Sequence, residues 1–280
     1  MVIATVQKGS AASVSAVPMS TLVFLHAHPD DECISTGGTM VRAKQEGHRV
    51  VLVVATGGEH GEKPDDLGPN ESLADRRKLE VSTSAATLGV DAIYWLGYLD
   101  SGMTGWEQNA DADAFWSADV DAAGARMAHI LREEHADVLV VYDWHGNYGH
   151  PDHIQVHRVG HAASKLAGTP KVFEATVNRD SLRAFMKLAA EMGGEVPFDP
   201  DEPADDGNPF GEPEAVLTHK VDVTAYVAQK KASMACHASQ ISDSSFFLAM
   251  PDEAFQVAFG TEWFIEVGKP AGINATWLLE

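Results

Sequence analysis

Residues 21–32 read TLVFLHAHPDDE, an uninterrupted apolar run that ends in a cluster of ionisable side chains. The run Thr21–Leu25 is rich in apolar, β-branched and aromatic residues and has the length of a strand buried on both faces. Three more runs of this kind follow at Val50–Ala55, Ala92–Leu96 and Val138–Tyr142. The chain is therefore predicted to build its core around four buried strands.

Segments with helical periodicity separate these strands. They cover Gly37–Glu46, Ser72–Leu88 and Asp121–His135, and Gly47 and Gly89 are suited to end the first two. Alternation of strand and helix predicts an α/β fold: a Rossmann-like, mostly parallel sheet with helices on both faces and right-handed crossovers. Such sheets bind ligands at the carboxyl ends of their strands, so we expect a site in the loops that follow these strands.

The second half of the chain is less regular and is predicted to be an elaborated C-terminal part of the same domain. Residues 193–214 are rich in Pro, Gly, Asp and Glu and are predicted to form a long surface loop, with 215–280 as a cap region. The expected elements are a strand at Val172–Val177, a helix at Ser181–Met192, a strand at Val216–Val223, a helix from Ala225 to His237 and a strand at Trp263–Val267. We interpret residues 21–280 as one domain.

The first twenty residues are rich in Ala, Ser and Val, and Lys8 is their only charged side chain. No apolar segment follows Lys8, so the stretch does not fit a secretory signal. We predict a disordered extension over residues 1–20. Met19 stands directly before the first strand and is an alternative start of translation.

Composition excludes several function classes. Lys and Arg number 20 against 41 for Asp and Glu, which gives a formal net charge of −21. Nucleic acid and anionic membrane surfaces are repelled by such a charge, and no apolar run approaches the ~20 residues that span a bilayer. The two cysteines, Cys33 and Cys236, fit neither a disulfide framework nor a cysteine zinc site, so we expect a cytoplasmic protein.

Two strand-end loops carry the residues that point to chemistry. The first is HAHPDDE at residues 26–32, and the second is DWHGNYGHPDH at residues 143–153. Several ionisable groups next to a buried strand need partners, and a metal ion would satisfy them. Histidine and aspartate without thiolates suit zinc or ferrous iron in a site that keeps a position open for water. Six residues in the two loops are candidates for three ligand positions, so the residue types alone leave the choice open. Hydrolysis is the reaction that these parts suggest.

These motifs resemble a known family. The run AHPDDE at residues 27–32, GGT at 37–39, TGGE at 56–59 and HPDH at 150–153 are similar in order and spacing to the LmbE-like (PIG-L) metal-dependent N-acetylglucosamine deacetylases. The resemblance covers about Thr21 to Leu166, and Lys230–Gln240, with its sequence HASQ at 237–240, resembles the family's C-terminal helix.

The resemblance implies a role for each matching residue. His28, Asp31 and His153 match the metal ligands, for Zn²⁺ or Fe²⁺. Asp30 matches the general base that activates water. His150 matches the side chain that stabilises the oxyanion and protonates the departing amine.

Four more residues receive roles around this centre. The resemblance implies that Asp152 orients His150, that Tyr148 polarises the amide carbonyl and that Arg77 contacts the substrate. Trp144 lies in the second loop and is predicted to stack on a sugar. The expected partner is a small amino-sugar conjugate, and a homo-oligomer remains open.

The similarity is greatest to bacterial members that act on mycothiol: the deacetylase of its inositol-linked precursor, or the amidase that cleaves mycothiol S-conjugates. The amidase branch is expected to carry a lysine shortly after HPDDE, whereas this chain has Ser35 there, which favours the deacetylase. A non-catalytic sugar-binding or metal-binding protein is the alternative from another class. It is disfavoured because binding alone needs neither Asp30 nor His150. Gly57 and Gly58 lack the surrounding pattern of a nucleotide-binding loop.

Neighbouring residues of the same types are predicted to have structural roles. Glu32 is expected to accept backbone N–H groups where a helix begins. His26 and Cys33 are expected to pack in the core or behind the site. His157 and His161 continue the four-residue spacing of His153 but are not needed as ligands.

Overall fold

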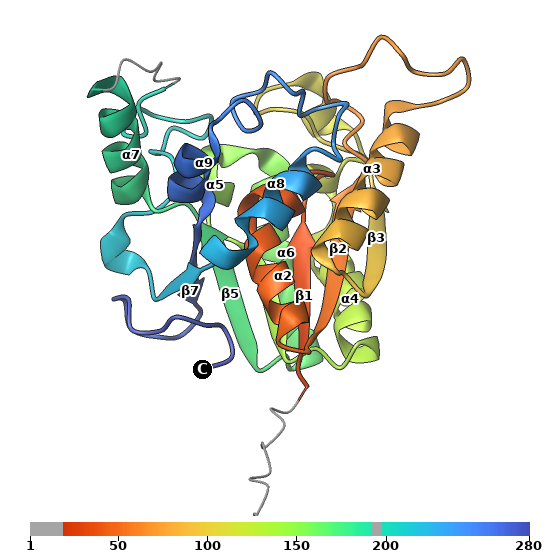
Figure 1. Cartoon of the computed structure of the whole chain (residues 1–280). Coiled ribbons are helices and arrows are strands. Elements are labelled where there is room, and N and C mark those ends of the chain that lie inside the picture. Colours follow the sequence, from red (N-terminus) through yellow and green to blue (C-terminus); the bar gives the residue numbers. More distant parts are fainter. Residues whose placement is uncertain (1–18, 192–197) are drawn as a thin grey trace, which may run out of the picture.

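A seven-stranded sheet forms the centre of the protein in this computed structural model, which describes residues 19–191 and 198–280 (Figure 1). The strand order is β3-β2-β1-β4-β5-β7-β6, in which the first five positions are parallel and the β5–β7 and β7–β6 pairs are antiparallel. This confirms the predicted α/β fold with a mostly parallel sheet. The strands are β1 (Thr21–His26), β2 (Arg49–Thr56), β3 (Ala92–Tyr98), β4 (Val138–Tyr142), β5 (Lys171–Thr176), β6 (His219–Asp222) and β7 (Thr261–Glu266).

The sheet is buried on both faces because alternate side chains of its central strands supply two apolar cores. Leu22 and Phe24 of β1 belong to one core, and Val23 and Leu25 belong to the other. Helices α2 (Gly37–Gln45) and α3 (Leu73–Leu88) cover the first face, with α8 (Val227–Met234) packed against them, and α4 (Val120–Glu133) and α6 (Pro151–Ala167) cover the second (Figure 1). This arrangement explains why the first-half strands read as continuous apolar runs.

The C-terminal half departs more from the predicted boundaries. Strand β6 is shorter than the expected Val216–Val223, since residues 214–216 form a turn of 3-10 helix. Helix α8 ends at Met234, before the predicted His237, and helix α9 (Asp252–Phe259) was not predicted. The remaining helices are α1 (Asp31–Ser35), α5 (Gly146–Gly149) and α7 (Arg179–Glu191), and short 3-10 turns lie at Glu107–Ala110, Phe115–Ser117, Glu214–Val216 and Thr224–Tyr226.

The order of the strands places the two predicted site loops next to each other. From β1 the chain adds β2 and β3 on one side, and β4 and β5 lie on the other side of β1. β1 and β4 therefore flank the point where the strand order reverses, which is where open α/β sheets bind ligands. The loop after β1 holds HPDDE, and the loop after β4 holds the HPDH motif.

A buried ion pair ties the C-terminal elements to the first half of the chain. Lys230 of α8 and Glu262 of β7 are 1% and 2% exposed, and Nζ lies 2.6 Å from Oε1. The Glu262 carboxylate also accepts the backbone N–H groups of Gly38 and Thr39, both at 2.8 Å, in the first turn of α2. One carboxylate thus holds three elements together.

Lys230→Met is expected to destabilise the fold by about 3–5 kcal/mol, because it leaves the Glu262 charge buried without its cation. Urea denaturation measures this free energy. The adjacent Lys231 is the matched control, since it binds Met250 O and the Asp252 carboxylate, and Asp252 is 91% exposed. Lys231→Met should change the free energy of unfolding by less than about 1 kcal/mol. Equal losses in the two variants would contradict the assignment.

The predictions for residues 1–18 and 192–197 lie outside the described part of the chain. Within residues 19–191 and 198–280, no helix combines the length and apolar character needed to cross a membrane.

Candidate active site

The backbone of both loops is shaped to bring their side chains together. Asp30, before α1, has φ +107°, a conformation that favours glycine and costs an aspartate roughly 1–3 kcal/mol. In the second loop, Gly146 has φ +65°, and a Cβ there would overlap His153. His150 caps α6 and Pro151 occupies its first turn, a position that suits the fixed φ of proline.

Asp31 approaches both of the histidines that are predicted to bind the metal with it. Asp31 Oδ2 lies 3.4 Å from His28 Nδ1 and 3.4 Å from His153 Nε2. An ion with tetrahedral ligands at about 2.0–2.1 Å separates its ligand atoms by about 3.4 Å. Both ring nitrogens of His153 are buried and have no hydrogen-bond partner among the described residues. A metal would satisfy the otherwise unpaired Nε2, so these residues fit a metal ion.

The orientation of His28 is set by carboxylates behind it. Its Nε2 lies 3.1 Å from Asp152 Oδ2 and 3.5 Å from Asp100 Oδ1, which leaves Nδ1 facing Asp31. Burial alone would lower the pKa of His28, but these carboxylates raise it well above its ordinary value. Asp100 was not predicted from the sequence, although it follows the end of β3, where the strand-end rule directs attention.

Asp152 acts on a different histidine from the one predicted. Its carboxylate contacts His28 and accepts hydrogen bonds from the Ser101 backbone N–H at 2.9 Å and from the Ser101 hydroxyl. Its contact with His150 runs through the backbone, because the Asp152 N–H donates to His150 Nδ1 at 3.1 Å. The helix start, with its free N–H groups, is the reason that the main chain takes this role.

His150 lies against two of the predicted metal ligands, in surroundings that favour its neutral form. Its ring centre is 4.6 Å from that of His28 and 5.2 Å from that of His153. Burial, together with these two rings, lowers the pKa of His150 to about 2. Since Nδ1 accepts the Asp152 N–H, the single ring proton is on Nε2, which is therefore a donor.

Asp30 stands beside the predicted ligands with a perturbed carboxyl group. Burial raises the pKa of Asp30 to about 6, against the opposing charge of Arg77. The Arg77 guanidinium donates to Asp30 Oδ2 at 3.1 Å, to Pro29 O at 2.5 Å and to Gly58 O at 2.8 Å. Arg77 is thus buried behind Asp30 and joins the loops that follow β1 and β2, a contact that the predicted substrate role did not include.

Arg77→Lys is expected to lower kcat on the order of 10-fold to 10²-fold and to leave KM within about threefold, because a lysine cannot hold both carbonyls and the Asp30 carboxylate. Steady-state kinetics measures the two constants. Arg76, which pairs with Glu71 and Asp66 at the surface, provides the control Arg76→Lys, with unchanged kinetics. A rise in KM with unchanged kcat would instead support direct contact between Arg77 and the substrate.

The two predicted aromatic residues lie in different surroundings. The Tyr148 ring is centred 5.0 Å from His153 and 6.2 Å from His150, and burial raises its pKa, so its hydroxyl is a donor. Phe210 stacks on Tyr148 with centres 6.0 Å apart, a contact that sequence did not predict. Trp144 is 53% exposed and donates to Glu212 Oε1, and no contact joins it to the ligand cluster among the described residues.

The residues assigned structural roles have the expected contacts. Glu32 Oε2 accepts the Asp30 N–H at 3.0 Å, and His26 bridges Tyr142 and Thr36 through its two nitrogens. Cys33 is buried in an apolar cluster, and burial raises the pKa of its thiol well above the ordinary value. His157 and His161 both approach Glu174 on β5, apart from the centre.

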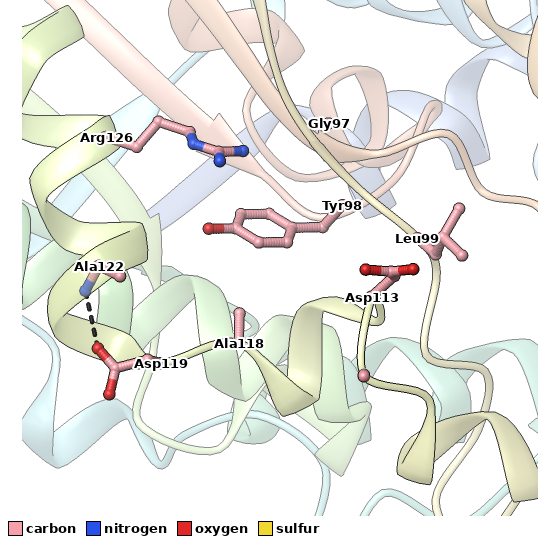
Figure 2. Close-up of a pocket in the computed structure, with 9 residues that line it drawn as sticks. Gly97, Tyr98, Leu99, Asp113, Ala118, Asp119, Ala122 and Arg126 are labelled. Atoms are coloured by element: carbon pink, nitrogen blue, oxygen red, sulfur yellow. Dashed lines mark hydrogen bonds between the residues drawn. The ribbon is translucent and has the colours of Figure 1, made fainter.

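One surface cavity is separate from this centre. It measures about 490 Å³ and lies between β3 and α4, where Arg126 packs over the Tyr98 ring at 4.9 Å (Figure 2). None of the predicted site residues lines it. The carboxylates Asp113 and Asp119 are at its rim, and Asp119 caps α4 by accepting the Ala122 N–H.

Comparison with known proteins identifies the family. The model described as PIG-L, GlcNAc-PI de-N-acetylase, matches residues 23–164. A 1D-myo-inositol 2-acetamido-2-deoxy-alpha-D-glucopyranoside deacetylase from Geodermatophilus obscurus is 36% identical over 286 residues, which cover 93% of this chain and 96% of the relative. The chain belongs to the PIG-L family. The resemblance inferred from the motifs is thereby confirmed.

Other PIG-L relatives agree. A protein of the same description from Streptomyces avermitilis is 39% identical over 272 residues, covering 89% of this chain and 92% of the relative. Among solved structures, N,N'-diacetylchitobiose deacetylase from Pyrococcus horikoshii is 22% identical, with a TM-score of 0.53 over 89% of this chain and 84% of that one. The solved structure shows the shared fold. PIG-L membership agrees with two overlapping groups around His28 that could hold a metal ion: His28 with His150 and His153, and His28 with Asp100 and Asp152.

Proposed function

We propose that this PIG-L protein is a metal-dependent deacetylase of an N-acetylglucosamine unit linked to inositol. The supporting observation is that Asp31 lies 3.4 Å from both His28 and His153, beside a carboxylate with a raised pKa, at the switch point of the sheet. The relatives that match over most of the chain carry the name of that activity. In this proposal the acyl group is acetyl. The sugar of the substrate carries no charge, so the formal net charge of −21 does not oppose its binding.

His28, Asp31 and His153 hold the metal, which we propose is Zn²⁺, with Fe²⁺ suited to the same ligands. When bound, the metal lowers the pKa of water and polarises the acetamide carbonyl. Asp30 accepts the proton of the attacking water, since a base with a pKa of about 6 is ionised near neutral pH and still a fair acceptor.

His150 and Tyr148 stabilise the charge that develops on the amide oxygen. The neutral His150 offers its Nε2–H, and Tyr148 offers its hydroxyl, so both can donate without first gaining a proton. A well-placed donor of this kind is worth ~3–4 kcal/mol in the transition state. We assign protonation of the departing amine to His150. Before this step His150 takes a second ring proton at Nδ1 from solvent, so its contact with the Asp152 N–H must open. Asp30 returns the proton that it took from water to solvent, and the two transfers balance.

Release of acetate from GlcNAc-inositol tests the proposal. The metal-loaded protein should release one acetate per free amine formed. A mycothiol S-conjugate serves as the competing substrate, because the amidase alternative predicts cleavage of its cysteinyl amide instead. Faster cleavage of the conjugate would assign the chain to the amidase activity, and inactivity on both substrates with metal bound would contradict the proposed function.

A further inference from the structure

The proposed general base is held in a conformation that aspartate rarely adopts. The positive φ of Asp30 needs continuing support from its surroundings. Arg77 holds the carboxylate, and Glu32 Oε2 accepts the Asp30 backbone N–H at 3.0 Å. The side chain and the main chain of Asp30 are thus fixed by two different residues.

Glu32 is itself held by groups distant in sequence. Its carboxylate is completely buried, and Oε1 accepts the Ser84 hydroxyl of α3 at 2.6 Å. The same oxygen lies 2.7 Å from Nε2 of His237, which follows α8 and is also completely buried. A buried carboxylate needs such partners, and by holding Oε1 they fix the carboxylate whose other oxygen, Oε2, faces Asp30.

His237 has no other polar contact that explains its place in the core. Its Nδ1 is buried without a hydrogen-bond partner among the described residues. A buried polar atom left unpaired is unfavourable, so packing alone does not favour histidine here. Glu32 is the one hydrogen-bond partner of the His237 side chain in the described residues.

We infer that His237 is a positioning residue for the reaction: through Glu32 it fixes the strained backbone of Asp30 and so aims the base. The inference rests on the proposed function. It makes the segment after α8 a part of the catalytic apparatus, although it lies about two hundred residues from Asp30 in sequence.

His237→Leu and His237→Gln separate this role from simple packing. Leucine removes the contact with Glu32, whereas the glutamine amide can donate to the same oxygen. We expect kcat to fall about 10-fold to 10²-fold in the leucine variant, with KM and metal content unchanged, and to stay within about threefold in the glutamine variant. In an Asp30→Ala background the leucine change should add less than about twofold, since both changes act on one step.

His219→Leu is the matched control. His219 is another buried histidine that faces a glutamate, with Nε2 3.8 Å from Glu266 Oε2 on the C-terminal strands. Its loss should lower the melting temperature and leave kcat unchanged. If His237→Leu does not fold, Glu32→Gln takes its place. Glutamine leaves no buried charge without a partner, but it has one acceptor oxygen where the Glu32 carboxylate has two.

Crystal structures of the variants keep the inference separate from the proposed function. We expect φ of Asp30 to become negative in His237→Leu, or in Glu32→Gln in its place, and to stay positive in His237→Gln. An unmoved Asp30 in the variant lacking the contact would overturn the inference, as would equal kcat in the parent and that variant or additive losses with Asp30→Ala. An inactive parent contradicts only the proposed function, and the Asp30 conformation then decides the inference.

Discussion

In His153→Ala, bound metal is expected to fall from one ion per chain to less than about a tenth. Loss of a residue that only hydrogen-bonds to a ligand can weaken metal binding by about 10²-fold, and loss of a ligand itself should weaken it at least as much. Acetate release should fall on the order of 10³-fold or more, since water without a metal has a pKa near 15.7 rather than ~7. Elemental analysis and acetate release, measured on the same preparation, check both expectations.

His157→Ala is the matched control for this change. His157 lies one turn beyond His153 on α6 and contacts Tyr142 O and the Glu174 carboxylate. The variant should keep its metal and its activity. Undiminished metal in His153→Ala would refute the ligand assignment. Removal of metal from the parent with a chelator should abolish activity, and added Zn²⁺ or Fe²⁺ should restore it, which separates loss of the ion from damage to the fold.

The first half of the fold could be predicted because its strands are buried on both faces. β1 and β4 are continuous apolar runs, so composition alone marks them. In contrast, β6 has buried and exposed side chains in alternation over only four residues, and α9 is a two-turn helix with one fully buried residue. Short, half-buried elements carry too little periodicity to be bounded from sequence.

The loop beyond residue 197 shows a second limit. Its composition predicts a surface loop, yet its backbone is attached to the site. Arg179 donates to Phe210 O at 2.8 Å and to Gly211 O, and the Gly211 N–H donates to Asn147 O at 2.7 Å. Every residue has a backbone carbonyl that can accept a hydrogen bond, so no residue type marks these contacts in the sequence.

The candidate site divides in the same way. Side chains within one motif, such as His28 and Asp31, could be placed together from their spacing and strand-end position. The partners that orient them come from other loops. Asp100 contacts His28 from the end of β3, and His237 contacts Glu32 from beyond α8. Such tertiary pairings require the folded chain, which is why the family resemblance supplied roles but not the contact of Asp152 with His28.

Asp30→Ala is expected to lower kcat by about 10²–10⁴-fold, the usual contribution of a positioned general base, with metal content unchanged. Asp30 donates no ligand atom to the cluster of His28, Asp31 and His153, so losing its carboxylate leaves the metal in place. Asp137→Ala, which removes an exposed carboxylate that accepts the Thr21 N–H at the opposite end of the sheet, should leave kcat unchanged. A kcat within about threefold of the parent in Asp30→Ala would exclude Asp30 as the base.

Substitution of Asp30 should also change the stability of the protein, because the backbone of Asp30 is strained. At φ +107° alanine keeps the steric conflict of Cβ, whereas glycine removes it. Asp30→Gly should therefore be more stable than Asp30→Ala by about 1–2 kcal/mol in urea denaturation, while both have equally low kcat. The aspartate would then be retained against the backbone preference because the reaction needs its carboxylate, not because the fold does. Equal stability of the two variants would mean that Asp30 relaxes once its carboxylate is gone, so that its contact with Arg77 creates the strain.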